Sequence, residues 1–156
     1  MIAATSLALL YLASASLAWI DLRRGIIPDW LNLAIALLGL AKAVLLDGWA
    51  SGLSAGAGGI VIGAIVWLLR RLYFMFRKFQ GLGLGDVKLL AASGIWVCVA
   101  GVPIQLLIAS MTALAAAGIM HLAGRSVTRL TPLPFGPFLA LGLVATVSLQ
   151  YGGWIG

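Results

Sequence analysis

Long apolar stretches, separated by short segments with basic residues, dominate this sequence. A membrane-spanning helix needs about 20 consecutive apolar residues, and six stretches reach or approach that length: Ile2–Ile20, Trp30–Leu46, Leu53–Leu69, Val87–Ala100, Val102–Leu122 and Phe138–Tyr151. Hydrophobic residues make up 63% of the 156 residues and charged residues 9%, whereas about 25% of a soluble domain is charged. The sequence therefore predicts an all-α, polytopic integral membrane protein of about six transmembrane helices, with a single transmembrane domain over residues 1–156. It excludes a disordered chain, a collagen, a disulfide scaffold and a nucleic-acid-binding protein.

The basic residues predict the orientation of these spans. Nine of the ten lie on one side of a six-span arrangement, with Lys42 as the exception: Arg23, Arg24, Arg70, Arg71, Arg77, Lys78, Lys88, Arg125 and Arg129. The positive-inside rule assigns that side to the cytoplasm, so both termini are predicted outside. The first apolar run has no basic residue before it, which favours a retained span over a cleaved signal peptide. The net charge of +6 also favours contact with anionic lipids of the bilayer.

Few side chains are available for chemistry. Cys98 is the single cysteine, His121 is the single histidine, and the four acidic residues are all aspartates. These numbers exclude a disulfide and disfavour a Ser-His triad or a histidine metal site. We predict packing for Cys98, an interfacial position for His121, and no metal or cofactor. Acid–base chemistry by carboxylates must come from the aspartates.

Three aspartates are predicted on the cytoplasmic side. Asp21 ends the first span, Asp29 opens the second, and Asp86 opens the fourth after the alternating glycines of Gly81–Gly85. Two carboxylates held close together cannot easily both ionise, so they share one proton. The ionised group can deprotonate a water while the protonated group polarises a carbonyl. Asp21 and Asp86 are the candidates for this pair.

Simpler interpretations of these residues stay open from spacing alone. Asp86 could be a helix N-cap, and Asp21 could pair with Arg23 or Arg24. Asp29 is predicted to cap the second span after Pro28. The glycine run does not match the GxGxxG nucleotide fingerprint, but backbone without side chains would let an extended peptide approach a carboxylate.

Three blocks together resemble the type IV prepilin peptidases, a family of GxGD-type membrane aspartic proteases. The first block runs from Asp21 to Asp29 (DLRRGIIPD), the second from Gly83 to Leu89 (GLGDVKL), and the third from Pro134 to Ala140 (PFGPFLA). The resemblance extends from Trp19 to about Gly142, which is most of the chain.

The resemblance implies a function and a site. Asp21 and Asp86 match the two catalytic aspartates of enzymes that remove the basic leader from prepilins or pseudopilins at the cytoplasmic face of the bacterial inner membrane, in type IV pilus or type II secretion systems. The leader is expected to pass along a strand-like segment over Gly83–Gly85. Residues expected to support the site or bind substrate are Gly83, Gly85, Lys88, Pro134, Phe135, Gly136 and Asp29. Lys88 could tune Asp86 or lie at the interface.

The chain departs from the family pattern at two places. Many members have an N-terminal domain with two Cys-x-x-Cys pairs that accompanies N-methylation, so one cysteine predicts a short, peptidase-only form without methyltransferase activity. Gln80 replaces a residue that is often acidic. Three alternatives remain: a preflagellin-type peptidase, a proton or ion pathway using the same carboxylates, and a structural membrane subunit.

Overall fold

The computed structural model describes residues 2–77, 83–123 and 134–155. These residues form five helices: α1 (Ile2–Arg24), α2 (Asp29–Asp47), α3 (Trp49–Arg77), α4 (Leu84–Leu122) and α5 (Gly136–Tyr151). The first four are long and apolar enough to cross a membrane, and α5 is a shorter apolar helix. The prediction of an all-α, multi-pass membrane protein is confirmed. The number of helices differs from the predicted six.

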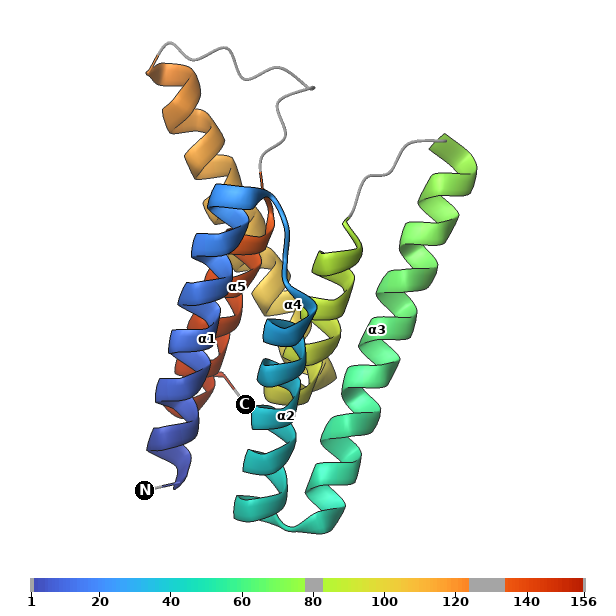
Figure 1. Cartoon of the computed structure of the whole chain (residues 1–156), viewed down its shortest axis with the longest axis vertical. Helices are drawn as coiled ribbons and strands as arrows, with labels where there is room; N and C mark the ends of the chain where they lie inside the picture. Colours follow the sequence, from blue (N-terminus) through green and yellow to red (C-terminus); the bar gives the residue numbers. More distant parts are fainter. Residues whose placement is uncertain (1, 78–82, 124–133, 156) are drawn as a thin grey trace.

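The difference in number arises in α4, which contains both the fourth and the fifth predicted stretch. Cys98 has non-helical backbone angles inside it (φ 57°, ψ 174°). Gln105 Nε2 donates a hydrogen bond to Ser93 Oγ at 3.0 Å, although 12 residues of straight helix would separate them by about 18 Å. The chain therefore reverses at Cys98, and the two halves of α4 lie against each other (Figure 1). Gln150 of α5 donates to the carbonyl of Val97 beside this break.

Close glycine contacts join α3 to the first half of α4. A Cβ on Gly59 would lie 2.8 Å from the carbonyl oxygen of Ala91, and a Cβ on Gly63 would lie 3.0 Å from the Cβ of Ala91. Small residues four apart let two helices approach closely in lipid. The spacing of these glycines along α3 therefore serves helix packing.

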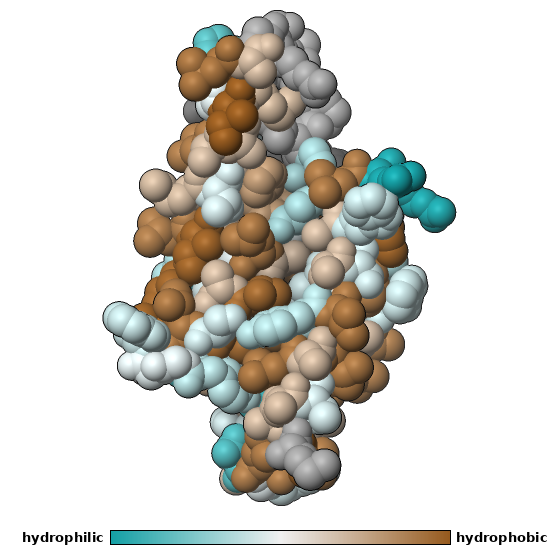
Figure 2. All heavy atoms as spheres, turned by 90° about the vertical axis from the view of Figure 1, so that its left-hand side faces the viewer, coloured by the Kyte–Doolittle hydropathy of each residue, from teal (hydrophilic) through white to brown (hydrophobic). Residues whose placement is uncertain are grey.

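Apolar side chains occupy both the interior and the sides of the bundle. Leu10, Leu17, Ile35, Leu89 and Leu139 are fully buried between helices, while many other large hydrophobic side chains are exposed. The lateral face in Figure 2 is mostly hydrophobic, and its most hydrophilic atoms gather near the upper end. Such a surface suits contact with lipid along the length of the helices.

The three motif blocks of the sequence lie together at one end of α1, α2 and α5. The end of α1 and the beginnings of α2, α4 and α5 all lie there (Figure 1). Among the residues discussed above, Lys78, Gln80, Gly81, Arg125 and Arg129 lie outside the described residues. The remaining motif residues can be placed, and they meet at this end.

Candidate active site

Asp21 lies in the last turn of α1, where the helix ends. Gly25 follows in the left-handed region (φ 64°) and donates its N–H to the Asp21 carbonyl at 2.7 Å, as glycine commonly does at a helix C-terminus. The Asp21 side chain is only 5% exposed. Its carboxylate accepts a hydrogen bond from the N–H of Gly136, the first residue of α5. Asp21 therefore satisfies a donor that the beginning of α5 leaves without a partner inside its own helix.

Glycine at position 136 is required by this approach. A Cβ there would lie 2.5 Å from Asp21 Oδ2 and 2.9 Å from Ile27 Cδ1. Any other residue would push the carboxylate away from the beginning of α5. The third motif block thus reaches the site through its backbone.

Asp86 is the third residue of α4, and Gly83 occupies the N-cap position. The Asp86 carboxylate accepts a hydrogen bond from the N–H of Gly83, the arrangement that an acidic residue at this position makes in a capping box. The open interpretation of Asp86 as the N-cap itself is therefore wrong. A spacing of three residues between glycine and aspartate is what this contact needs.

The predicted strand-like segment over Gly83–Gly85 is also wrong. Gly83 is extended (φ −65°, ψ 148°), but α4 begins at Leu84, so Gly85 is helical. A Cβ on Gly85 would lie 2.8 Å from the Cβ of Ile27. The second glycine of the motif therefore permits contact between α4 and the segment after α1, and it is not part of an extended edge for a peptide.

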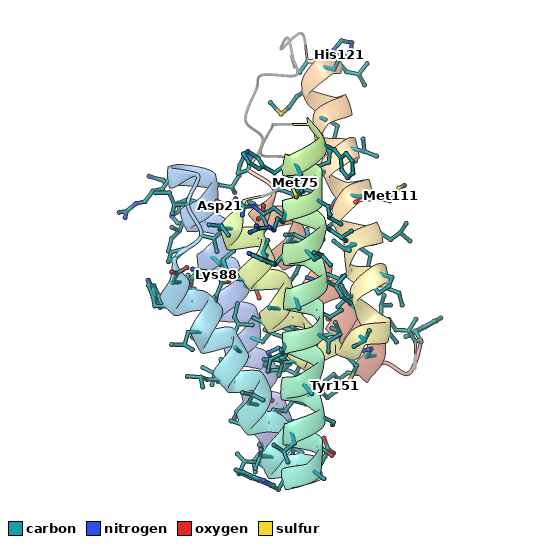
Figure 3. The ribbon with its side chains drawn as sticks, turned by 90° about the vertical axis from the view of Figure 1, so that its right-hand side faces the viewer. Asp21, Met75, Lys88, Met111, His121 and Tyr151 are labelled. Atoms are coloured by element: carbon teal, nitrogen blue, oxygen red, sulfur yellow. The ribbon has the colours of Figure 1, made fainter. Side chains whose placement is uncertain are left out.

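The two aspartates, 65 residues apart in sequence, line one pocket of about 630 Å³. Asp86 is only 9% exposed, and the two carboxyl groups are close enough to interact electrostatically. Figure 3 labels two residues that line this pocket, Asp21 and Lys88, which lie below the upper tips of α3 and α4. Its lining comprises Asp21, Leu22, Gly25, Ile26, Ile27, Asp29, Gly83, Leu84, Gly85, Asp86, Lys88, Pro134 and Phe135.

Lys88 forms an ion pair with Asp29. Its Nζ lies 2.7 Å from both oxygens of the Asp29 carboxylate, and both side chains are exposed. The predicted cap of α2 is therefore wrong, because Pro28 takes the N-cap position and no side-chain cap bond forms. The structure thus gives the Lys88 ammonium a partner that neither predicted role named, the Asp29 carboxylate at the pocket mouth.

The predicted alternative of an Asp21 ion pair with a neighbouring arginine is not what the described residues show. The guanidinium of Arg23 lies over the ring of Trp19, 4.6 Å from its centroid, and no ion pair joins Asp21 to Arg23 or Arg24 in the described ranges. The Asp21 carboxylate instead faces the pocket and α5.

Ile27 is the site residue that sequence reasoning missed. Its side chain meets the positions of both Gly85 and Gly136, so it packs between the beginnings of α4 and α5 and separates them. Its place in the first motif block, just before Pro28, was the available signal. A single apolar residue cannot be distinguished by its type in a sequence as apolar as this one, which is why the role of Ile27 could not be assigned.

Two other residues lie away from the site. His121 is exposed at the tip of α4, well above Asp21 in Figure 3. Cys98 is exposed at the reversal of α4, so the predicted packing role for it is wrong. Neither residue lines the pocket.

The sequence profile of the type IV leader peptidase family matches residues 8–118. The chain belongs to this family. The match contains both Asp21 and Asp86, and it ends before the third motif block. It confirms the resemblance that the motif blocks carry.

Proteins similar in sequence to this member of the type IV leader peptidase family have names that match the family. A prepilin leader peptidase/N-methyltransferase from Burkholderia pseudomallei (strain K96243) is 37% identical over 136 residues, which cover 86% of this chain and 43% of that protein. A protein of the same name from Escherichia coli (strain K12) is 37% identical over 143 residues, 90% of this chain and 60% of that protein. The chain thus spans about half the length of these relatives. No solved structure matches it significantly.

The side chains available for acid–base chemistry in this pocket are the carboxyl groups of its aspartates. In the described ranges, no three His, Cys, Asp or Glu side chains cluster as ligands for a metal ion. Two buried carboxyl groups in one pocket, each hydrogen-bonded to a backbone N–H at the beginning of a helix, can hold one proton and a water between them.

Proposed function

We propose that this chain is a membrane aspartic endopeptidase that removes the leader peptide from prepilin-type substrates. The relatives are named prepilin leader peptidases, and the site provides the groups that hydrolysis of a peptide bond needs. The proposal covers the peptidase part of those names. The lack of methyltransferase activity stays a prediction.

The observation that carries the proposal is the meeting of Asp21 and Asp86 in one pocket. They come from the end of one helix and the beginning of another, and both are buried. Burying two carboxyl groups next to each other costs free energy, so a chain that keeps both in one pocket is expected to use them. Sharing a proton for catalysis is such a use.

In the proposed mechanism the two carboxyl groups act as one unit with a single proton. The ionised carboxylate takes a proton from a water molecule as the water oxygen attacks the scissile carbonyl carbon. The protonated carboxyl donates a hydrogen bond to the carbonyl oxygen, which gains negative charge. Proton transfer to the amide nitrogen then allows the C–N bond to break, releasing the leader with a new carboxyl terminus and the mature chain with a new amino terminus.

The charges at the pocket favour a basic leader. The pocket lining has three carboxyl groups, those of Asp21, Asp29 and Asp86, and one ammonium group, that of Lys88. With one proton on the catalytic pair and Asp29 balanced by Lys88, one negative charge remains. A basic segment is attracted to this pocket. The basic residues nearby support a cytoplasmic orientation of this end through the positive-inside rule.

Cleavage of a purified prepilin in detergent or lipid tests the proposal. Asp21→Asn and Asp86→Asn should each lower kcat/KM at least about a thousandfold, as loss of a member of a catalytic unit does. Asp47→Asn is the matched control, because Asp47 is exposed at the opposite end of α2. Retained cleavage in either folded site variant would remove that residue from the mechanism.

Two alternatives predict other results in the same assay. A preflagellin-type peptidase would cut an archaeal-type leader and leave the prepilin intact. A proton or ion pathway would cut neither. The position of both aspartates at helix ends beside an open pocket favours the peptidase, since pathway residues line the interior of the spans.

A further inference from the structure

A second hollow of about 550 Å³ lies between α2, α3 and α4 and continues from the catalytic pocket. The two share Asp29 and Lys88, so the ion pair stands where they join. Beyond the pair the groove is mostly apolar, with Leu33, Ala36 and Ile60 in its lining. It therefore leads from the candidate catalytic end along the membrane-spanning helices.

Asn32 is the unusual residue of this groove. It lines the hollow, is 5% exposed, and has no hydrogen-bond partner for either Nδ2 or Oδ1. Buried polar groups are nearly always hydrogen-bonded, and the hydrocarbon part of a membrane provides no water to satisfy them. A buried amide without a partner in an otherwise apolar groove indicates that its partner arrives with a ligand.

The substrate of the proposed function provides such a partner. An apolar helix that follows a cytoplasmic leader begins near the cleavage site, and its first four N–H groups have no acceptor inside the helix. Asn32 lies three residues after Asp29, which is about 4.5 Å further along α2. Its Oδ1 is therefore about one helical turn below the pocket mouth, the depth at which a substrate helix presents these donors. A lipid chain has no donor to offer.

We propose that this groove binds the first turns of the substrate's apolar helix and that Asn32 accepts a hydrogen bond from an N–H at the beginning of that helix. The inference rests on the proposed function. In the empty groove both amide atoms are covered, so the side chain rotates towards the helix when it binds. The occupied groove then holds the helix while the leader extends into the catalytic pocket.

Disulfide cross-linking tests the location. In a Cys98→Ser, Asp86→Asn background, which retains uncut substrate, Ile60→Cys is compared with Val61→Cys. Both residues are exposed on α3, but only Ile60 lines the groove. A prepilin with one cysteine in the first turns of its apolar helix should cross-link at position 60 at least about fivefold more than at position 61. Equal cross-linking, or none at position 60, would place the helix elsewhere, with lipid or a second copy of the chain left as the occupant.

Asn32→Leu tests the hydrogen bond. Because the amide has no partner in the unbound chain, the variant should melt at no lower temperature, yet KM for the prepilin should rise about tenfold with kcat nearly unchanged. Ser14→Ala is the matched control, since Ser14 Oγ is also buried without a partner but lies on α1, away from the groove. It should change neither constant. An unchanged KM, or a lower melting temperature with both constants altered, would assign Asn32 a structural role only.

The two proposals fail in distinguishable ways. If the wild-type chain does not cut prepilin, the proposed function fails and the cross-linking result still reports whether the groove holds the helix. If the wild-type chain cuts prepilin while Asn32→Leu and the position 60 cross-link show no effect, only the groove is overturned.

Discussion

At the scale of single residues, the site depends on contacts between carboxylates and backbone. Asp21 and Asp86 are each held by a backbone N–H, of Gly136 and Gly83 respectively. The glycines that flank them leave the room that these contacts need. The absence of a side chain at these glycines therefore determines where each carboxylate can lie.

Gly136→Ala tests this spacing. The added Cβ would overlap with Asp21 Oδ2, and a displacement of about 1 Å at a catalytic group can cost about a hundredfold in rate. We expect kcat for prepilin cleavage to fall by that order, with the chain still folded by circular dichroism. Gly118→Ala is the control, because a Cβ at that α4 position meets nothing within 4 Å. Normal activity in Gly136→Ala would contradict the assigned contact.

The Lys88–Asp29 pair gives a second prediction at this scale. Both side chains are exposed, so breaking the pair should change the free energy of unfolding by less than about 1 kcal/mol. The charge at the pocket mouth changes in opposite directions: Asp29→Asn should raise KM for a basic leader about threefold, and Lys88→Gln should lower it by a similar factor. Steady-state kinetics at low and high salt would measure this. Shifts in the same direction would rule out the electrostatic explanation.

At the scale of helices, α3 and α4 are joined by close backbone contact. Gly59→Ala would bring a Cβ to 2.8 Å from the Ala91 carbonyl and 2.6 Å from an Ile95 side-chain carbon. Such overpacking costs about 1–3 kcal/mol. The melting temperature in detergent should fall for Gly59→Ala and stay level for Gly58→Ala, whose Cβ would have only ordinary contacts, 3.7 Å and beyond. Equal melting temperatures would contradict the tight packing of α3 on α4 at Gly59.

The helices themselves follow from the length of the apolar stretches, which is why the class could be predicted. The boundary between the fourth and fifth predicted stretches, at residue 101, also predicted a break within a few residues of the reversal in α4. Its exact position could not be predicted, because a non-glycine residue with positive φ such as Cys98 leaves no mark in an apolar run. Pro103 was a nearby sign of a break. Interhelical contacts such as Trp96 Nε1 to the Ile35 carbonyl, at 2.8 Å, depend on the packed structure and have no local pattern.

The candidate site was predictable to the extent that charge determines topology. Placing the basic residues on one side of a membrane puts Asp21 and Asp86 at the same end, and the structure shows them in one pocket. The partners of each carboxylate were not predictable, since Gly136 and Gly83 act through backbone groups that every residue has. The ion pair of Lys88 was missed for a different reason: three aspartates and several basic residues at one end allow many pairings.

At the scale of the whole molecule, the orientation in the membrane can be measured directly. In a Cys98→Ser background, Arg24→Cys lies at the candidate site end and Asp47→Cys at the opposite end; both residues are exposed. A membrane-impermeant thiol reagent should label Asp47→Cys in intact spheroplasts, and Arg24→Cys only after permeabilisation. The reverse pattern would invert the proposed orientation.

The meeting of three helix beginnings at one pocket has an electrostatic consequence. Peptide dipoles give the first turn of a helix a partial positive charge, and α2, α4 and α5 all begin around the carboxyl groups. Part of the positive charge that stabilises these carboxylates therefore comes from the main chain, and it does not change with pH. Substitutions of other side chains in the pocket leave these helix dipoles unchanged. The leader preference could therefore be altered by such substitutions while the electrostatic stabilisation of the two carboxylates is kept.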